Sequence, residues 1–235
     1  MVFIINRKKL AIYCAVTIAV IAALSGISNG YHAVSAIPAT NRIIILDPGH
    51  GGPDGGASGS DGTVEKELNL SMALKVQKLL QQAGCTVFMT RSDDRSLSTI
   101  EDEVKKMRKI ADLNNRKEIS ERLGVDAFVS IHMNTFSDPQ YFGTQTFYSS
   151  SPADSKFLAD FIQEEIRLID PANKRETKNG TGSIFILDGV SVPSVVVECG
   201  FLSNPTDLQR LKSEEYQNKL AGAIFNGIIK FYAAS

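Results

Sequence analysis

The sequence contains little histidine, little cysteine and almost no net charge. Its 235 residues include three histidines and three cysteines, and the formal net charge at pH 7 is -1. Without an excess of basic residues, the chain has no electrostatic reason to bind nucleic acid. So few cysteines in a chain of this length exclude a disulfide-rich scaffold. The sequence also lacks internal repeats and low-complexity segments, which excludes repeat architectures.

The composition is that of an ordinary globular protein. Hydrophobic residues make up 43% of the chain and charged residues 22%, and the length allows one large domain or two small ones. No disulfide between Cys85 and Cys199 can be inferred from their spacing. Cys199 directly follows Glu198 in a predicted strand, so the two side chains should point to opposite faces. We expect Cys199 to act as a small buried hydrophobe.

The N-terminal residues predict an export signal. Three basic residues, Arg7 to Lys9, precede an apolar run from Leu10 to Leu24, which is the layout of a signal peptide. The run is slightly short for a membrane span but compatible with one, and Val34 to Ala36 offers small residues for signal cleavage. A buried helix of a soluble protein is the weaker alternative. We expect a signal peptide or membrane anchor over 1–36, a linker over 37–41 and a catalytic domain over 42–235.

Downstream of residue 41, apolar runs alternate with helical patterns, which predicts an α/β fold. We expect a single domain with a mostly parallel, twisted sheet of about six strands and helices on both faces. The densely charged stretch 93–117 is predicted to be helical in part. Its basic cluster from Lys105 to Lys109 could contact an anionic polymer, but a solvated helix face is the favoured interpretation. The predicted strands cover 42–46, 86–90, 127–132, 144–149, 183–187 and 194–199, and the clearest predicted helices cover 64–80, 152–168 and 213–232.

Two of the histidines stand where predicted strands end. His50 follows the run Ile43 to Leu46 within a glycine-rich loop, and His132 ends the run from Phe128. In parallel sheets ligands bind beyond the carboxyl ends of the strands, so a shared metal site is favoured over two structural histidines. A carboxylate from the start of the first helix completes a zinc-type ligand set. By position alone, Glu65 and Glu67 have equal claims to that role.

A further acid, Glu198, ends the apolar strand 194–199. A carboxylate there is costly unless it is paired, hydrogen-bonded or used. It suits a general base that takes a proton from water and returns it to a leaving amine, although an acid in a salt bridge or helix cap is the alternative. Asp47 could orient a metal ligand or the loop backbone, or it could cap the turn that follows it; the sequence leaves these two interpretations equal.

Several ordered stretches resemble the zinc-dependent N-acetylmuramoyl-L-alanine amidases, often called amidase type 3. The resemblance extends over about residues 42–232, and the order of its motifs makes chance agreement improbable. The matching stretches are Leu46 to Gly52 with Asp54, Thr90-Arg91, Glu65 with Leu68 to Leu70, Ser130 to Asn134, and Pro193 to Asn204.

The resemblance implies that His50, Glu65 and His132 bind Zn²⁺ and that Glu198 is catalytic. It thereby selects Glu65 over Glu67. The implied reaction is hydrolysis of the amide between N-acetylmuramic acid and L-alanine of the peptidoglycan stem peptide. Stretch 184–187 departs from the family pattern, because a tyrosine-bearing segment would be expected there, and this affects the substrate groove.

Within the family, the short chain, the N-terminal apolar segment and the stretch Gly143 to Tyr148 look most like the spore-cortex, germination-specific amidases. That likeness implies a part in muramic-δ-lactam formation, and a location outside the cytoplasmic membrane, in the forespore intermembrane or cortex region. Because no wall-binding repeats are seen, an exported accessory or activating protein is a further hypothesis. The alternatives are another zinc peptidase, such as a carboxypeptidase of related fold, and a non-catalytic glycan-binding module.

Overall fold

The structure is a computed structural model, and it describes residues 16–17, 38–99, 101–102, 107–122 and 124–235. The chain divides into two compact units, residues 1–36 and 37–235. Most of the predicted export segment and the small residues 34–36 therefore lie outside the described residues. Within the described ranges, no helix has both the length and the hydropathy needed to cross a bilayer.

The second unit is built on a mixed sheet of six strands in the order β2-β1-β3-β6-β4-β5. The pairs β1–β2, β1–β3, β3–β6 and β4–β5 are parallel, whereas β4 runs antiparallel to β6. The predicted α/β fold with a mostly parallel sheet is confirmed. The strands are β1 Ile43–Pro48, β2 Thr86–Met89, β3 Ala127–Asn134, β4 Gln145–Tyr148, β5 Lys178–Asn179 and β6 Ser194–Phe201.

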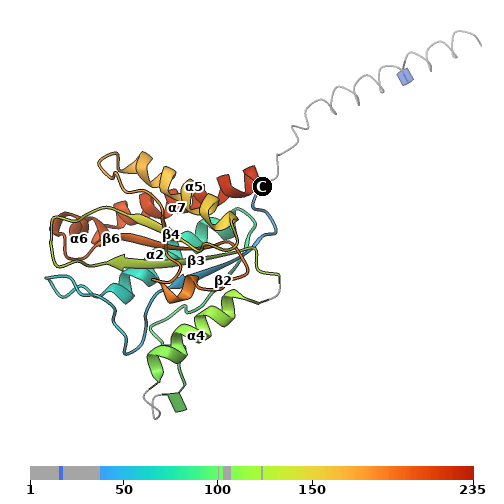
Figure 1. Cartoon of the computed structure of the whole chain (residues 1–235). Helices are drawn as coiled ribbons and strands as arrows, with labels where there is room; N and C mark the ends of the chain where they lie inside the picture. The colour runs from blue at the N-terminus through green and yellow to red at the C-terminus, as the bar shows by residue number, and fades with distance from the viewer. Residues whose placement is uncertain (1–15, 18–37, 100, 103–106, 123) are drawn as a thin grey trace, which may run out of the picture. The chain divides into compact units, whose positions relative to one another are not determined.

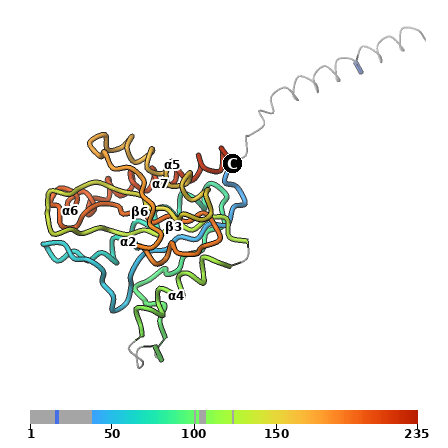
Figure 2. Tube along the Cα trace, in the orientation of Figure 1, coloured from blue at the N-terminus to red at the C-terminus, as the bar shows by residue number. Residues whose placement is uncertain are grey.

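Helices cover both faces of this sheet unequally. Figure 1 shows α5 (Asp154–Ile169) and α7 (Glu214–Ala234) together above the sheet and α4 (Arg108–Ser120) below it. Side chains of α2 (Glu65–Gln82), α5 and α7 share one hydrophobic core with the strands. The opposite face has a small core of five buried residues, to which the 3₁₀ turn η1 (Phe185–Leu187) contributes. The trace in Figure 2 shows η1 next to α4.

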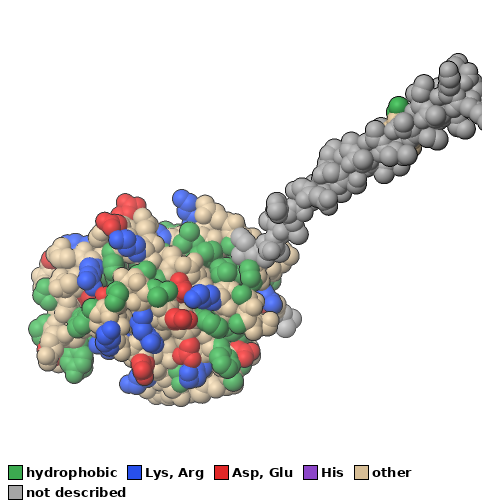
Figure 3. Space-filling model, turned by 90° about the horizontal axis from the view of Figure 1, so that it is seen from above, with side chains coloured by type: hydrophobic (Ala, Val, Ile, Leu, Met, Phe, Trp, Pro, Cys, Tyr) green, Lys and Arg blue, Asp and Glu red, His purple; other side chains and the backbone are tan. Residues whose placement is uncertain are grey.

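Alternation along the strands decides which side chains reach the site. In β1, Ile44 and Leu46 enter the large core, whereas Ile45 enters the small one. In β3, Val129 lies in the large core, so His132, three residues further, has the parity of the small-core face. The face with fewer helices is therefore the face that carries His132. The helix-covered side, seen from above in Figure 3, carries interspersed acidic and basic side chains rather than a field of one sign.

The structure corrects the prediction for residues 183–187, which form no strand. Ser183 and Ile184 donate their backbone N–H groups to the carbonyl of Gly180, and Leu187 donates to Ile184. These are local turn hydrogen bonds, and they leave no ladder for a neighbouring strand. Four apolar residues in succession signal burial but not which secondary structure buries them.

Two elements were not predicted. The added ones are β5 and α6 (Pro205–Lys212). Asn204 accepts hydrogen bonds from the N–H groups of Thr206 and Asp207, and Pro205 occupies the first turn. This Asn-Pro pair is a helix start signal that was present in the sequence. The prediction that the charged stretch 93–117 is helical in part is confirmed by α4 from Arg108 onward and by residues 101–102. Residues 100 and 103–106, which include the first two residues of the basic cluster 105–109, lie outside the described residues.

Candidate metal centre

Glu65, the first residue of α2, lies between the two histidines. Its Oε1 atom is 3.2 Å from His50 Nε2 and 3.0 Å from His132 Nδ1. One ligand atom from each of the three residues can be chosen so that all lie within 4.8 Å of one another. Glu67 is exposed instead. The structure therefore brings together the residues that the sequence singled out, and it separates Glu65 from Glu67.

The loop between β1 and α2 can hold these side chains because two of its glycines leave no room for a Cβ atom. A Cβ on Gly49 would lie 2.1 Å from His132 Cε1, and one on Gly56 would lie 2.4 Å from Glu65 Oε2. His50 itself has a φ of 61°, which is uncommon for a residue with a side chain. Glycine is thus required at these two positions because the loop backbone lies directly against the His132 and Glu65 side chains.

Hydrogen bonds orient both the carboxylate and the first imidazole. Glu65 Oε2 accepts from the N–H of Ala57 at 2.7 Å, and its Oε1 accepts from the N–H of Met133 at 3.1 Å. His50 Nδ1 lies 2.9 Å from Asp54 Oδ2, which leaves Nε2 to face Glu65. An imidazole held by a carboxylate on its outer nitrogen is the usual arrangement of a metal-binding histidine.

The charges of the site couple its members. Burial lowers the pKa of His50, but hydrogen bonds and charge from Glu65 and Asp54 outweigh burial and raise that pKa to about 9. Burial raises the pKa of Glu65, and the hydrogen bonds to His132 and His50 more than reverse that effect and lower it. Without a metal, a proton on His50 therefore supplies the positive charge beside Glu65 that a bound cation would otherwise supply.

Glu198 lies opposite His132 on the neighbouring strand β6. Burial raises its pKa, and its Oε2 atom is buried without a hydrogen-bond partner among the described residues. A buried carboxylate oxygen with no partner is costly, so this atom is available for a ligand. Cys199, the next residue, enters the large core on the other face, and both Cys85 and Cys199 are free and buried.

Beneath the loop lies a buried ion pair between Asp47 and Arg116. The Arg116 Nη1 atom is 2.6 Å from Asp47 Oδ1, and both side chains are almost fully buried. Asp47 also accepts hydrogen bonds from the hydroxyls of Thr90 and Ser130, each at 2.6 Å. These side-chain contacts include no turn cap; Asp47 instead binds Arg116, which in turn donates to the loop backbone at Pro48 and His50.

Two arginines bind the backbone of the loop that carries His50. Arg116 donates to the carbonyl oxygens of Pro48 and His50, and Arg91 donates to those of Pro48 and Gly49. Sequence reasoning missed Arg116, because nothing in a densely charged stretch distinguishes a buried arginine from solvated ones. Arg91 was visible only as part of a motif.

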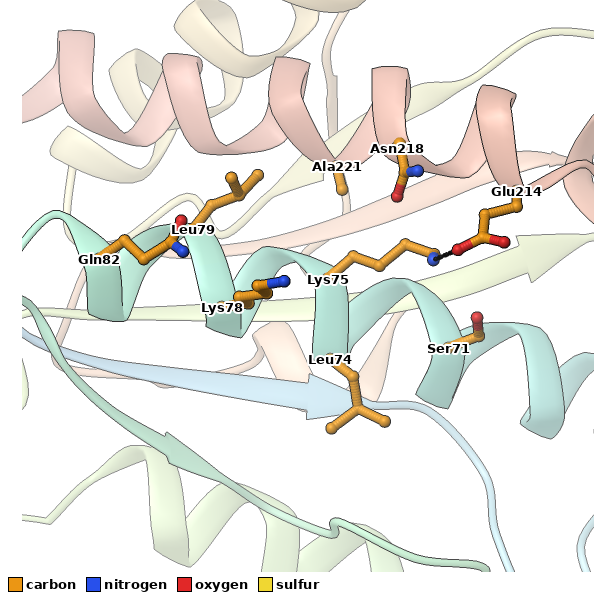
Figure 4. A pocket seen from close by; sticks show the side chains of 9 residues that line it. All are labelled: Ser71, Leu74, Lys75, Lys78, Leu79, Gln82, Glu214, Asn218 and Ala221. Atoms are coloured by element: carbon orange, nitrogen blue, oxygen red, sulfur yellow. Dashed lines mark hydrogen bonds and ion pairs between the residues drawn. The ribbon is translucent and has the colours of Figure 1, made fainter.

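A cleft of about 160 Å³ opens beside the site. It lies between α4 and the 184–186 segment, and His50, His132, Lys109 and Phe185 contribute to its walls. A larger groove of about 590 Å³ lies elsewhere, between α2 and α7 (Figure 4). It contains no histidine, and its one acid, Glu214, is 3.5 Å from Lys75. The metal-type cluster, and not that groove, is the candidate site.

Comparison with known proteins places this geometry in a family. Residues 44–230 match the family described as N-acetylmuramoyl-L-alanine amidase, Amidase_3. The chain is 36% identical over 197 residues to the germination-specific N-acetylmuramoyl-L-alanine amidase of Bacillus subtilis strain 168, with 84% of this chain and 82% of that protein covered.

Solved structures agree with the sequence comparison. The CwlD amidase from Clostridioides difficile, determined in complex with the GerS lipoprotein, superposes with a TM-score of 0.79 at 43% identity. That match covers 83% of this chain and all of the other. An N-acetylmuramoyl-L-alanine amidase from Clostridium difficile 630 gives a TM-score of 0.72 at 28% identity, covering 83% and 99% of the two chains.

Proposed function

The chain belongs to the N-acetylmuramoyl-L-alanine amidase family, and from that premise we propose that it is a zinc enzyme with His50, Glu65 and His132 as metal ligands and Glu198 as its general base. The bond cleaved is the amide between the lactyl group of N-acetylmuramic acid and L-alanine of the stem peptide. The observation that carries the proposal is the convergence of two imidazole nitrogens and one carboxylate oxygen within 4.8 Å.

The residues present fit a zinc ion. Two histidines and one carboxylate are a known ligand set of catalytic zinc, which keeps a further position for water or substrate. The Asp54 carboxylate behind His50 supplies the expected outer support. Zinc in such a site would supply Lewis acidity toward the scissile carbonyl and toward water, whose pKa it would lower to about 7.

Glu198 is placed to move the proton. It faces the same side of the sheet as His132, and its Oε2 atom has no hydrogen-bond partner among the described residues. A carboxylate there accepts the proton of the attacking water and delivers it to the nitrogen of L-alanine as the amide bond breaks. Burial raises the pKa of Glu198, which is the direction that makes a carboxylate a stronger base.

The buried side chains of Arg91 and Arg116 position the loop that carries His50 and take no part in the reaction itself. Arg116 and Arg91 donate four hydrogen bonds to the three carbonyl groups of the loop from Pro48 to His50. Fixed loop carbonyls fix the Cα position of His50, so the imidazole is held before a metal arrives. We assign both residues to preorganisation of the site.

We also propose an exported, spore-cortex role. Its support is the likeness to a germination-specific amidase and to the CwlD amidase, together with the signal-like N-terminal sequence. The substrate would then be cortex peptidoglycan in the formation of muramic-δ-lactam. Since the CwlD structure contains the GerS lipoprotein, an exported lipoprotein is the kind of accessory partner we propose for this chain.

Digestion of purified wall fragments tests the proposed reaction. We expect new amino-terminal alanine and free muramyl lactyl groups, and we expect a chelator to abolish and zinc to restore their release. Release of carboxyl-terminal D-alanine would instead assign a carboxypeptidase. The cellular role is tested by mass spectrometry of muropeptides from spores lacking the protein, which should contain no muramic-δ-lactam; a normal lactam content would contradict it.

A further inference from the structure

An arginine and three aromatic rings form a cluster at the carboxyl ends of β3 and β6. Phe136 and Tyr141 pack edge to face with their ring centroids 4.7 Å apart, and Tyr141 lies 6.5 Å from Phe201. The guanidinium carbon of Arg175 lies 4.6 Å from the Phe201 ring centroid and 5.9 Å from that of Tyr141. We call this group the aromatic–arginine cluster.

The strand register places this cluster next to Glu198. Gln145 of β4 is the antiparallel partner of Glu198 in β6, so both side chains lie on the same face of the sheet. Arg175 Nη1 donates to Gln145 Oε1 at 3.1 Å. Strand β6, which carries Glu198, lies between β3 and β4. His132 is therefore on one side of Glu198, and Gln145 with its partner Arg175 is on the other.

Arg175 is a half-buried cation without an acidic partner. Its Nε donates to the carbonyl oxygen of Phe142, and its second terminal nitrogen, Nη2, has no hydrogen bond to any described residue. Among the described residues no carboxylate lies within ion-pair distance of its guanidinium. The charge of Asp207 acts to raise the pKa of Arg175, but the Asp207 carboxylate accepts its hydrogen bonds from the backbone N–H groups of Phe201 and Gly143. Burial lowers the pKa of Arg175, as expected for a cation that lacks compensation.

Space for a ligand adjoins this cation. Arg175, Tyr141 and Phe142 line an open hollow of about 530 Å³. Tyr141 and Phe142 remain 44% and 42% exposed there, so apolar surface is available beside the charge. A planar guanidinium next to exposed rings is suited to bind a carboxylate on a short peptide.

We propose that Arg175 is a specificity residue that binds the free α-carboxylate of the second stem-peptide residue. This inference rests on the proposed amidase function, which fixes the L-alanine amide between the metal ligands and Glu198. The second residue is a D-glutamate joined through its side-chain carboxyl, so its α-carboxylate projects freely. Because Arg175 is hydrogen-bonded to Gln145, the strand partner of Glu198, a stem peptide that extends from Glu198 across β4 carries this carboxylate toward Arg175.

A purely structural role of Arg175 predicts a different effect of its loss on substrate cleavage. If Arg175 only held the loop through Phe142, its loss would slow cleavage of every substrate to the same degree. A carboxylate-binding role makes the loss depend on one group of the substrate. The decisive readout is therefore a ratio of two substrates and not a single rate.

The test uses the full chain loaded with zinc and two synthetic muramyl peptides. They differ only in having a carboxylate or a carboxamide on the second residue. We expect the wild-type protein to favour the carboxylate by about tenfold or more in kcat/KM, chiefly through KM. R175Q should reduce this ratio to about one, R175K should keep part of it, and K178Q, which removes an exposed cation of β5, should leave it unchanged.

Each outcome decides the inference. Equal cleavage of both peptides by the wild-type protein, or an undiminished ratio in R175Q, would overturn it while leaving the amidase function intact. A parallel fall on both peptides in R175Q would assign Arg175 to loop support and would also overturn it. Cleavage of neither peptide by the zinc-loaded wild-type protein would count against the proposed function itself.

Discussion

Glu65 is the residue on which the candidate site converges. It accepts two backbone N–H groups and faces both imidazoles, and its side chain is 4% exposed. Burial alone would favour the protonated acid, whereas the two histidines hold its pKa below the usual value. The carboxylate is thus kept charged in a place from which water is largely excluded, which is the state a metal ligand requires.

The substitution Glu198→Gln separates metal binding from catalysis. We expect E198Q to retain zinc, because His50, Glu65 and His132 are unchanged, and to lose turnover by about 10²- to 10⁴-fold, because an amide cannot accept the proton. Zinc content by mass spectrometry and hydrolysis of a muramyl peptide measure the two properties. H50A is the companion variant and should lose both. Full activity of E198Q would remove Glu198 from the mechanism.

A second residue-scale prediction concerns Asp47. Burial raises its pKa, but the charge of Arg116 and the hydroxyl hydrogen bonds outweigh this and lower the pKa. A lowered folded-state pKa contributes stability above the unfolded value of about 3.9, and that contribution disappears as pH falls below it. We expect D47N to reduce the free energy of unfolding by on the order of 3 kcal/mol at pH 7, because it removes the more deeply buried of the two carboxylates that pair with Arg116 and leaves only Asp112.

Denaturant unfolding of both proteins at pH 7 and near pH 3 measures the effect. The difference between wild type and D47N should shrink at the lower pH, because Asp47 of the unfolded wild-type chain becomes protonated there while the folded carboxylate, with its lowered pKa, does not. D93N is the control, since Asp93 is 63% exposed in an ion pair with Arg95, and it should change stability by less than about 0.5 kcal/mol. An equal D47N effect at both pH values would contradict the account.

Sequence reasoning found the residues that end strands and missed those that support them. His50, His132 and Glu198 follow apolar runs, so their clustering could be inferred from the rule for parallel sheets. Periodicity could not choose Glu65 over Glu67, because that choice depends on where the loop delivers the first turn of α2. Arg116 could not be found at all, since its burial is decided by contacts across 69 positions of the chain.

At the scale of elements, the loop between β1 and α2 does most to shape the site. Gly49 packs against the ring of His132 so closely that a Cβ atom would overlap it. The loop carbonyls on either side are fixed by Arg91 and Arg116. The loop therefore has little freedom to move away from an added methyl group.

The variant Gly49→Ala tests this constraint. The added Cβ must displace His132, so we expect zinc affinity to fall by about 10- to 100-fold, similar to loss of a supporting contact of a metal ligand. Competition with a chromogenic chelator measures the affinity. G222A is the matched control, because a Cβ at Gly222 of α7 meets nothing within 4 Å. It should keep zinc affinity and raise stability by about 0.5–1 kcal/mol; unchanged zinc affinity in G49A would contradict the argument.

Elements with periodic sequence were predicted well, and short aperiodic ones were not. Helix α5 and strand β6 carry patterns long enough to specify both type and approximate bounds. Segment 183–187 does not, because its backbone hydrogen bonds go to Gly180 and to one another. Strand β5 has two residues, too few for any alternation to be read.

At the scale of the whole molecule, one sheet separates a packing face from a working face. Helices α2, α5 and α7 bury the larger core on one side. On the other side α4 and η1 cover only a small core, which leaves His132 partly exposed near the carboxyl end of β3, with the buried Glu198 opposite it on β6. Both cores and the site lie within residues 38–235.

We therefore expect a chain restricted to residues 38–235 to fold and to cleave soluble muramyl peptides with the kinetic constants of the full chain. The N-terminal segment should matter for location, because its basic and apolar residues have the layout of an export signal. Cell fractionation should find the full chain outside the cytoplasmic membrane and the shortened chain inside. A shortened chain that is exported equally well would contradict this division of roles.

The most direct measurement for the central claim is anomalous scattering from zinc-loaded crystals, collected on both sides of the zinc absorption edge. The account predicts one strong peak at about 2.0–2.2 Å from a nitrogen of His50, a nitrogen of His132 and an oxygen of Glu65, the bond lengths usual for zinc. A peak held by other residues, or no peak at these three in protein that is active with zinc, would contradict it.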